Sequence, residues 1–595
     1  MKKHILLFSC IVLIFACKEK NNSTEKIVQK ASIDTLFKNY YEEGLKLYPL
    51  NATFAGDDRY NNYLPNDITA SFKKKEKEFY QQYKSKLLKF NKDSLSQEKR
   101  MSYDVLMWEC NINLDRLQYP TELTPINQFS SLPQTIGQLA GGSSAQPFKT
   151  VSDYKNWLQR LDDYVVWCDS AIVNMKKGIA TGNVLPKALT EKVIPQMESF
   201  SSGDAKEHLF YTPIKNIPSS FSSTEKDSLA KAYENMIAEK IIPTYKKLET
   251  FFKTEYLPAS RESSGINATP RGNAYYGHQI QTYTTTSLEA DSIHKLGLSE
   301  VARIEEEMKK VMVKVGFKGE LKDFFNAVRT TKALMPFDKP EQVIANFNAI
   351  HQKMKPQLAT LFDLVPKTEF EVRRTEAFRE ASASAEYNPG SLDGTRPGIF
   401  YVPIPDVKKY NVYSDEDLFL HEAIPGHHYQ ISLQQENTSL PDFRKTLWYS
   451  AYGEGWALYS ESLGKELGLY DDPYQYFGML SAEMHRAIRL VVDTGLHTKG
   501  WTREEAIEFS LAHEAESEES IIAEIERYMS WPGQALSYKI GQLKIIALRN
   551  KAQQALGEKF SIKEFHNNVL ESGCIPLKLL EDKINTWIDN TKNNG

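Results

Sequence analysis

Apolar residues recur at spacings of three and four along most of the chain, and charged residues occupy the positions between them. This period fits the 3.6 residues per turn of an α-helix that buries one face, so we predict a mainly α-helical fold. We find no repeat of fixed period, which argues against a solenoid. The predicted helical segments are residues 33–47, 68–90, 154–179, 223–252, 288–315, 340–361, 414–435, 447–467, 476–497 and 503–530.

One short segment breaks the helical pattern. Residues 398–404 read Gly-Ile-Phe-Tyr-Val-Pro-Ile, and this mixture of β-branched and aromatic side chains predicts a β-strand. Pro397 and Pro405 bound the segment. Prolines at both ends favour an edge strand, where one side of the backbone needs no partner.

Two connectors rich in Gly, Ser and Pro, residues 130–146 and 260–277, are candidate borders of sub-domains. Neither has the length of a disordered linker. We therefore predict a single helical catalytic domain over residues 33–590, divided into two lobes.

The N-terminus has the pattern of an export signal. Two lysines precede an apolar stretch at residues 5–16, too short to cross a bilayer as a mature helix, and Cys17 follows. The residues before Cys17 resemble a bacterial lipobox, so we predict a signal peptide at 1–16 and lipidation of Cys17. Residues 17–32 are polar and predict a flexible tether. The expected location is the cell envelope, with a lipid anchor on the periplasmic or outer-membrane surface side; an ordinary secretory signal is the alternative.

Charge and cysteine content narrow the classes of function. The formal net charge is −4, and residues of both signs are interspersed with no basic block, which argues against nucleic acid as a partner. Beyond the signal, Cys110, Cys168 and Cys574 lie far apart with no Cys-x-x-Cys spacing. This excludes a disulfide-rich scaffold and a cysteine-type zinc finger.

The sequence His-Glu-Ala-Ile-Pro-Gly-His-His at residues 421–428 is the clearest chemical feature. A zinc peptidase usually presents H-E-x-x-H on one helix, with two histidines on the ion and the glutamate as base. Here Pro425 takes the place of the second histidine. Because proline cannot donate its backbone hydrogen bond and Gly426 is flexible, we predict a bulge or short opening in the helix.

The spacing leaves open which later histidine pairs with His421. On an unbroken helix His428 lies about 20° from His421, yet roughly 10 Å along the axis. A bulge changes both values, so His427 and His428 remain alternatives. A pair of histidines that packs inside a helical core is the non-metal interpretation.

A third ligand is needed, with one position left open for water. Glu454 lies between two glycines at the start of an apolar helical pattern, and a hairpin of two helices would return it to the histidines. The alternative role is a glutamate that stabilises a helix N-terminus. Glu461 shares the same helix face and is a candidate supporting residue.

Other polar residues are candidates for substrate contact. Arg489, Asp493 and His497 are spaced by four and would line one helix face. Either His497 or Arg489 is expected to contact substrate, with Asp493 orienting it; an ion pair plus a C-terminal histidine is the alternative. Tyr528 and Tyr538 are candidate donors to an oxyanion, although core packing is expected for at least one of them.

Four ordered motifs, H-E-x-x-P-G-H-H, G-E-G-W-A, V-V-D-T-G-L-H and P-G-Q-A-L-S-Y, resemble a bacterial family catalogued as domain of unknown function 885, often found as lipoproteins. The family resembles helical zinc peptidases of the gluzincin type. The resemblance implies His421, His427 and Glu454 as ligands of one zinc ion and Glu422 as base, with His428 nearby. It also implies a helical metallopeptidase-like fold with a deep cleft and a small β-sheet near the site.

We therefore expect a zinc-dependent hydrolase, most simply a peptidase that uses metal-activated water. The strand at residues 398–404 would then pair with an extended peptide substrate. Two alternatives remain: an amide or ester hydrolase acting on cell-envelope fragments, and a non-catalytic surface-binding lipoprotein. The expected partners are the peptide substrate and the membrane, through the lipid.

Overall fold

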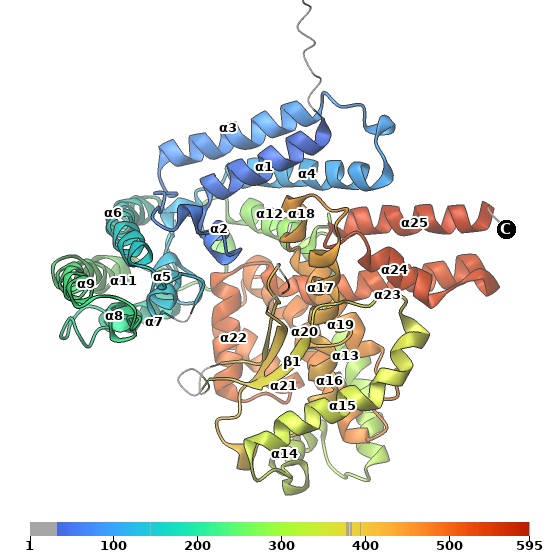
Figure 1. Ribbon diagram of the computed structural model, residues 1–595. Helices are drawn as coiled ribbons and strands as arrows, with labels where there is room; N and C mark the ends of the chain where they lie inside the picture. The colour runs from blue at the N-terminus through green and yellow to red at the C-terminus, as the bar shows by residue number, and fades with distance from the viewer. Residues whose placement is uncertain are drawn as a thin grey trace, which may run out of the picture.

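The computed structural model describes residues 32–593, except residues 143, 377–379, 381–382, 393 and 395. The predicted signal peptide, Cys17 and the tether up to residue 31 lie outside the described residues. Helices make up most of the described chain, and the strands form one small sheet, so the prediction of a mainly α fold is confirmed (Figure 1). No helix among the described residues is long and apolar enough to span a bilayer.

The first helices form a layer across one side of the molecule, drawn in blue in Figure 1. Ser32 caps the first of them by accepting a hydrogen bond from the backbone N–H of Thr35, in the way expected at a helix start. The layer consists of α1 (Ile33–Leu47), α2 (Pro49–Phe54), α3 (Ala70–Leu87) and α4 (Gln97–Arg116).

A second group of helices projects to the left of Figure 1 and packs around its own hydrophobic cluster. Buried aromatic side chains such as Trp157, Tyr164 and Tyr245 fill this cluster. The group consists of α5 (Leu132–Ala140), α6 (Val151–Thr181), α7 (Lys187–Glu198), α8 (Thr212–Lys215), α9 (Ser223–Met236), α10 (Ile242–Phe251) and α11 (Leu257–Ala259).

The remaining helices build the body of the molecule around two further clusters. They are α12 (Gly272–Thr284), α13 (Ala290–Lys314), α14 (Leu321–Thr330), α15 (Pro340–Leu361), α16 (Asp415–Glu422), α17 (His427–Glu436), α18 (Asp442–Lys445), α19 (Ser450–Ser462), α20 (Pro473–Thr498), α21 (Arg503–His513), α22 (Glu518–Ser530), α23 (Ser537–Leu556), α24 (Ile562–Leu570) and α25 (Leu577–Asn593). The pairs α13–α20 and α19–α23 pack most extensively. The predicted cleft between two lobes, and the single catalytic domain, stay predictions.

The sheet has the order β1–β3–β2, where β1 is Phe370–Arg374, β2 is Glu386–Asn388 and β3 is Gly398–Val402. The central strand β3 pairs in parallel with β1 and antiparallel with β2. The prediction that residues 398–404 form an edge strand is therefore wrong. Pro397 and Pro403 fall just outside β3, so all five of its residues have a backbone N–H and both of its edges can pair.

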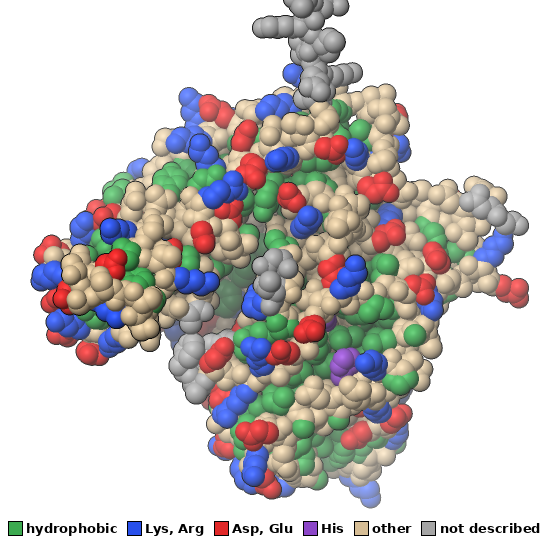
Figure 2. All heavy atoms as spheres, viewed as in Figure 1, with side chains coloured by type: hydrophobic (Ala, Val, Ile, Leu, Met, Phe, Trp, Pro, Cys, Tyr) green, Lys and Arg blue, Asp and Glu red, His purple; other side chains and the backbone are tan. Residues whose placement is uncertain are grey.

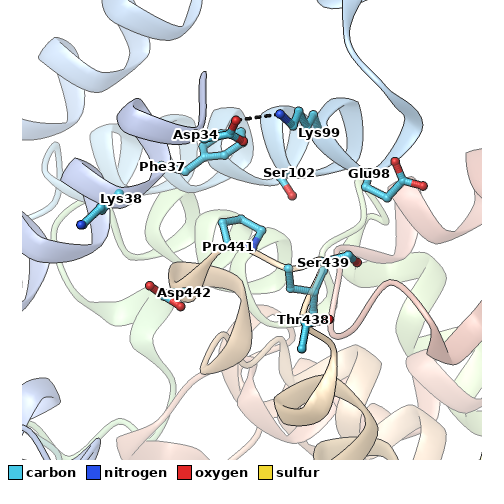
Figure 3. A pocket seen from close by; sticks show the side chains of 11 residues that line it. Asp34, Phe37, Lys38, Glu98, Lys99, Ser102, Thr438, Ser439, Pro441 and Asp442 are labelled. Atoms are coloured by element: carbon cyan, nitrogen blue, oxygen red, sulfur yellow. Dashed lines mark hydrogen bonds and ion pairs between the residues drawn. The ribbon is translucent and has the colours of Figure 1, made fainter. Parts of the chain in front are cut away.

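Charged side chains of both signs are interspersed over the face shown in Figure 2. Cys110, Cys168 and Cys574 are all buried and free. A cavity of about 260 Å³ opens between α1, α4 and the start of α18, where Lys99 pairs with Asp34 at 2.7 Å (Figure 3). Its lining shares no residue with the histidine-containing pocket described below.

Candidate metal centre

The run at residues 421–428 spans two helices. α16 ends at Glu422 and α17 begins at His427, so the four residues between them form a turn. A side chain at Gly426 would place its Cβ 2.0 Å from the carbonyl oxygen of His421 and 2.2 Å from that of Leu420, which only glycine avoids. The predicted opening is thus a complete break between two helices, and the predicted helix 414–435 is two elements.

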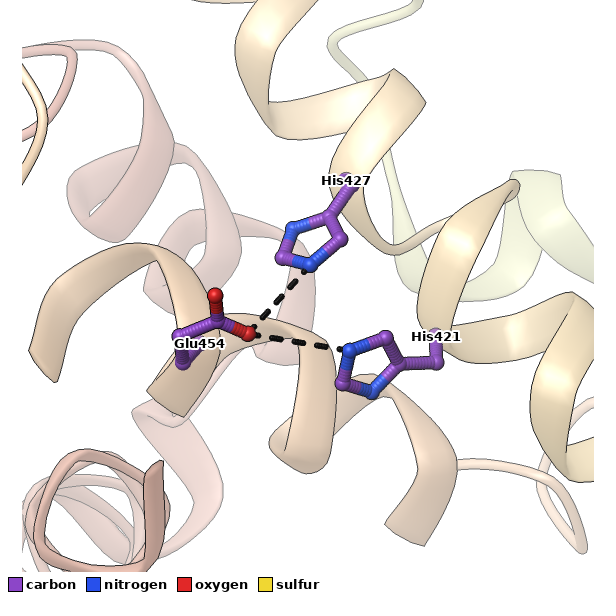
Figure 4. Close-up of side chains that lie close together, drawn as sticks. All are labelled: His421, His427 and Glu454. Carbon is purple, nitrogen blue, oxygen red and sulfur yellow. Dashed lines mark ion pairs between the residues drawn. The ribbon is translucent and has the colours of Figure 1, made fainter. Parts of the chain in front are cut away.

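This break brings three side chains to one point (Figure 4). His421 comes from the last turn of α16, His427 from the first residue of α17 and Glu454 from α19. The Nε2 atoms of His421 and His427 lie 3.7 and 3.4 Å from Oε2 of Glu454. Two zinc–ligand bonds of about 2.1 Å at a tetrahedral angle separate their donor atoms by about 3.4 Å. The two histidine–glutamate separations are therefore close to those expected for donors on a single zinc ion, and all three donor atoms lie within 4.8 Å of one another.

The glycines on either side of Glu454 allow its helix to pack closely. A Cβ on Gly453 would lie 2.1 Å from the indole ring of Trp448, which covers that position. A Cβ on Gly455 would lie 2.5 Å from the Cα of Gly541 on α23. The G-E-G motif therefore fixes the position of Glu454 through helix packing on both sides.

Trp456 joins the same helix to the turn between the histidines. Its indole N–H donates a 2.7 Å hydrogen bond to the carbonyl oxygen of Pro425, and both groups are buried. The Ile424–Pro425 peptide bond is cis. Trp456 thus holds the turn against the helix that carries Glu454.

Glu461 lies about two helical turns after Glu454 on α19 and supports His421. Its carboxylate accepts a 2.6 Å hydrogen bond from Nδ1 of His421, and only 1% of the residue is exposed. This contact leaves Nε2 of His421 facing Glu454. A carboxylate behind a ligating histidine orients the ring and makes it a stronger ligand.

His428 points to the sheet instead of to the other histidines. Its Nδ1 lies 3.0 Å from the hydroxyl of Tyr387 on β2, and its ring packs 4.9 Å from that of Phe370 on β1. Burial lowers the pKa of His428 to about 4. Of the two alternatives left open by the spacing, the structure brings His427 to His421 and Glu454. The Nδ1 atom of His427 is buried and lacks a hydrogen-bond partner among the described residues.

Glu422 lies beside the three candidate ligands in a pocket of about 460 Å³. Burial raises the pKa of its carboxyl group, partly offset by attraction to His421 and His427. By contrast, burial would raise the pKa of Glu454, but attraction to His427 and His421 lowers it below its ordinary value. The two glutamates therefore differ: Glu454 is held as a carboxylate, and Glu422 is the one suited to take up a proton.

The two candidate tyrosines occupy different places. Tyr538 lines the pocket, and the guanidinium of Arg489 stacks on its ring at 4.5 Å. Tyr528 is buried behind Arg489: it accepts from Nε of Arg489 at 3.0 Å and donates to Glu524 at 2.6 Å. Only Tyr538 is placed to reach a molecule bound in the pocket, so the candidacy of Tyr528 as an oxyanion donor is wrong.

Of Arg489, Asp493 and His497, only Arg489 lines the pocket, while Asp493 and His497 make buried hydrogen bonds within the protein. His497 is fully buried, with Nδ1 accepting from the N–H of Ile266 at 3.0 Å and Nε2 3.0 Å from the carbonyl oxygen of Tyr528. Asp493 accepts from the hydroxyl of Tyr276 and from a backbone N–H. The expectation that His497 contacts substrate and that Asp493 orients it is therefore wrong. The hydrogen-bonding groups of both side chains are paired with buried partners inside the protein.

Six residues that line this pocket escaped the sequence analysis: Ala385, Glu386, Tyr387, Ile431, Trp448 and Arg486. Arg486 lies one turn before Arg489 on α20 and lines the same pocket, and its spacing of three from Arg489 was the available signal. Trp448 lines this pocket and also a second cavity of about 440 Å³, which it shares with Glu454. Aromatic side chains of Trp108, Tyr283 and Trp531 line that second cavity.

Fold and site together define a class: a mainly helical protein with a buried two-histidine, one-glutamate centre at a break between helices. The chain belongs to the family described as "Bacterial protein of unknown function (DUF885)", whose model matches residues 49–584.

Two solved structures are similar to this chain over nearly its whole length. One, named "putative lipoprotein", is from Colwellia psychrerythraea: it is 28% identical, with a TM-score of 0.85, over 94% of this chain and 99% of that one. Another, named "putative lipoprotein of unknown function", is from Shewanella oneidensis: it is 19% identical, with a TM-score of 0.74, over 93% and 99% of the two chains. At that lower identity the likeness shows the fold alone. No curated protein matches the chain.

Proposed function

We propose that this protein is a zinc-dependent hydrolase that cleaves peptide bonds. The observation that carries the proposal is the convergence of His421, His427 and Glu454, with ligand atoms all within 4.8 Å of one another, beside Glu422 in an open pocket. Two histidines and a carboxylate, with one position left for water, form a known type of catalytic zinc site.

His421, His427 and Glu454 would hold a zinc ion, which would supply Lewis-acid chemistry for the activation of water and the polarisation of a carbonyl group near neutral pH. Glu422 accepts the proton of the attacking water and returns it to the leaving amine. The hydroxyl of Tyr538 donates a hydrogen bond to the oxygen that becomes negatively charged. Arg489, stacked on the tyrosine ring, holds it in place.

The edge of the sheet favours a peptide over other substrates. β2 is an edge strand, and its Glu386 and Tyr387 line the pocket together with Glu422. An extended peptide can add to such an edge through backbone hydrogen bonds. The substrate would then lie across the sheet edge with a carbonyl group at the centre.

The test combines metal content with one isosteric substitution. We expect about one zinc ion per purified chain by mass spectrometry, and hydrolysis of a mixed peptide library that a chelator abolishes and added zinc restores. Glu422→Gln should keep its zinc and lose hydrolysis by about 100-fold or more, because the proton acceptor is gone. Glu558→Gln, at an exposed glutamate, is the matched control and should behave as wild type.

Full activity of Glu422→Gln, or absence of zinc from the wild-type protein, would refute the proposal. Hydrolysis of envelope-derived amides or esters but of no peptide would support the alternative substrate class. Zinc binding without hydrolysis would support a surface-binding lipoprotein.

The location is part of the same proposal. The lipobox-like sequence before Cys17 and the names of the two similar structures support a lipid-anchored protein of the cell envelope. Metabolic labelling with a palmitate analogue should mark the wild-type chain and not Cys17→Ser.

A further inference from the structure

Two arginines on one face of α20 line the candidate metal pocket, and they differ in how their charge is matched. Arg489 pairs with Glu524 at 2.9 Å and donates to Tyr528 at 3.0 Å. Arg486 donates to the carbonyl oxygen of Ala482 at 3.2 Å and forms no ion pair with a described residue. Arg486 is thus an unmatched positive charge at the wall of the pocket.

Both guanidinium groups also have unused donors. Nε of Arg486 and Nη1 of Arg489 are buried and have no hydrogen-bond acceptor among the described residues. Buried N–H groups are nearly always paired in folded proteins. Two arginines one helical turn apart that line the same pocket therefore both keep donors that no described residue satisfies.

The acidic groups nearby are engaged elsewhere. Glu454 faces His421 and His427. Glu422 and the buried Asp417 feel the charge of Arg486, but neither makes an ion pair with it. None of these carboxylates forms an ion pair with Arg486, so its guanidinium lies without a described ion-pair partner beside the centre at which a carbonyl group would bind.

We infer that Arg486, assisted by Arg489, binds a carboxylate of the substrate. A planar guanidinium offers paired donors that match a carboxylate, and this geometry is specific for such a group. The inference rests on the proposed hydrolase function and names its substrate class: peptides with a free carboxylate close to the bond that is cleaved. That carboxylate has two sources, the chain terminus of a peptide and an acidic side chain.

The test uses three zinc-loaded proteins and three short peptides. The proteins are wild type, Arg486→Met, which removes charge and keeps bulk, and Arg100→Met, at an exposed arginine that also forms no ion pair with any described residue. The first two peptides share one sequence and end in a free carboxylate or in a carboxamide. The third ends in a carboxamide and differs from them only in having glutamate as its last residue. Hydrolysis is measured as kcat/KM, and binding is measured by calorimetry in the Glu422→Gln background.

We expect wild type and Arg100→Met to prefer at least one carboxylate peptide over the plain carboxamide by about 10- to 100-fold, in both kcat/KM and binding. Arg486→Met should lose that preference and treat the plain carboxamide as wild type does. Arg486→Lys should recover part of the preference, because lysine restores the positive charge but not the paired planar donors of a guanidinium group. Preference for the first peptide identifies the chain terminus, and preference for the third identifies an acidic side chain.

Equal treatment of all three peptides by wild type, or an unchanged preference in Arg486→Met, overturns the inference. Uniform loss of rate on every peptide in Arg486→Met also overturns it, since that result assigns Arg486 to the reaction step. If no peptide is cleaved, the proposed function fails and binding decides the inference alone: tighter binding of a carboxylate peptide that depends on Arg486 supports it, and equal or absent binding overturns it.

Discussion

Adding one methyl group at the contact between α19 and α23 is expected to displace Glu454, and so to weaken zinc binding at the candidate centre. In Gly455→Ala the new Cβ would lie 2.5 Å from the Cα and the carbonyl carbon of Gly541. Ordinary carbon–carbon contacts are about 3.5–4.0 Å, so the two helices must separate by roughly 1 Å. Both atoms belong to the backbone, so no side chain can rotate to relieve the contact.

The magnitude follows from two opposing effects. Alanine favours a helix over glycine by about 1 kcal/mol, whereas overpacking a close contact costs about 1–3 kcal/mol, and more when backbone must move. We expect a net loss of about 1–2 kcal/mol in the free energy of unfolding. A ligand site tolerates displacements of only about 0.5 Å, so a shift of Glu454 should also lower zinc affinity by about 10-fold or more.

Urea unfolding followed by tryptophan fluorescence gives the stability, and competition with a chromogenic chelator gives the zinc affinity. The matched control is Gly277→Ala on α12, where an added Cβ meets nothing within 4 Å. That variant should gain about 1 kcal/mol and keep its zinc. If both variants are stabilised alike, or if Gly455→Ala keeps full zinc affinity, the packing argument is wrong.

Further predictions concern hydrogen bonding, pH and catalysis. Trp456→Phe leaves the buried carbonyl of Pro425 without its 2.7 Å donor and should lower the free energy of unfolding by at least about 1–3 kcal/mol, measured in urea. Burial lowers the pKa of both His497 and His566 to about 3, so the unfolded chain alone gains protons below about pH 6.5. Each of these histidines should therefore contribute a fall of roughly 2 kcal/mol to the free energy of unfolding between pH 7 and pH 5, and the change measured over this range in His566→Gln should differ from that of wild type by about this amount. Tyr538→Phe should lower kcat by about 100-fold and leave the urea midpoint unchanged. An unchanged kcat would show that the hydroxyl of Tyr538 does not stabilise the transition state.

Helices were the most predictable part of the fold, because their apolar period is written directly in the chain. The predicted segments 33–47 and 340–361 coincide with α1 and α15. The predicted segment 414–435 was too long, because the opening expected at Pro425 and Gly426 is a complete break between α16 and α17 through which the apolar period continues. β1 and β2 went unpredicted because they are short and partly polar, and their pairing with β3 involves residues distant in sequence.

The candidate ligands were predictable for a different reason. His421 and Glu454 belong to unusual local motifs, so residue type and spacing sufficed to nominate them, whereas spacing left His427 and His428 as alternatives and only the family resemblance favoured His427. The surrounding roles depended on partners that spacing does not reveal: His497 meets backbone groups, and Arg489 meets Glu524. Sequence alone could not show which polar side chains are already engaged.

The contact of Gly455 with Gly541 also bears on how the protein acquires its metal. Glu454 is held in place by a helix that is synthesised long after both histidines, so the growing chain has no complete ligand set until most of it has been made and folded. A chain exported unfolded brings no preformed site across the membrane. Under the lipid-anchored proposal, the ions of the compartment in which the chain folds, rather than those of the cytosol, decide which metal it receives.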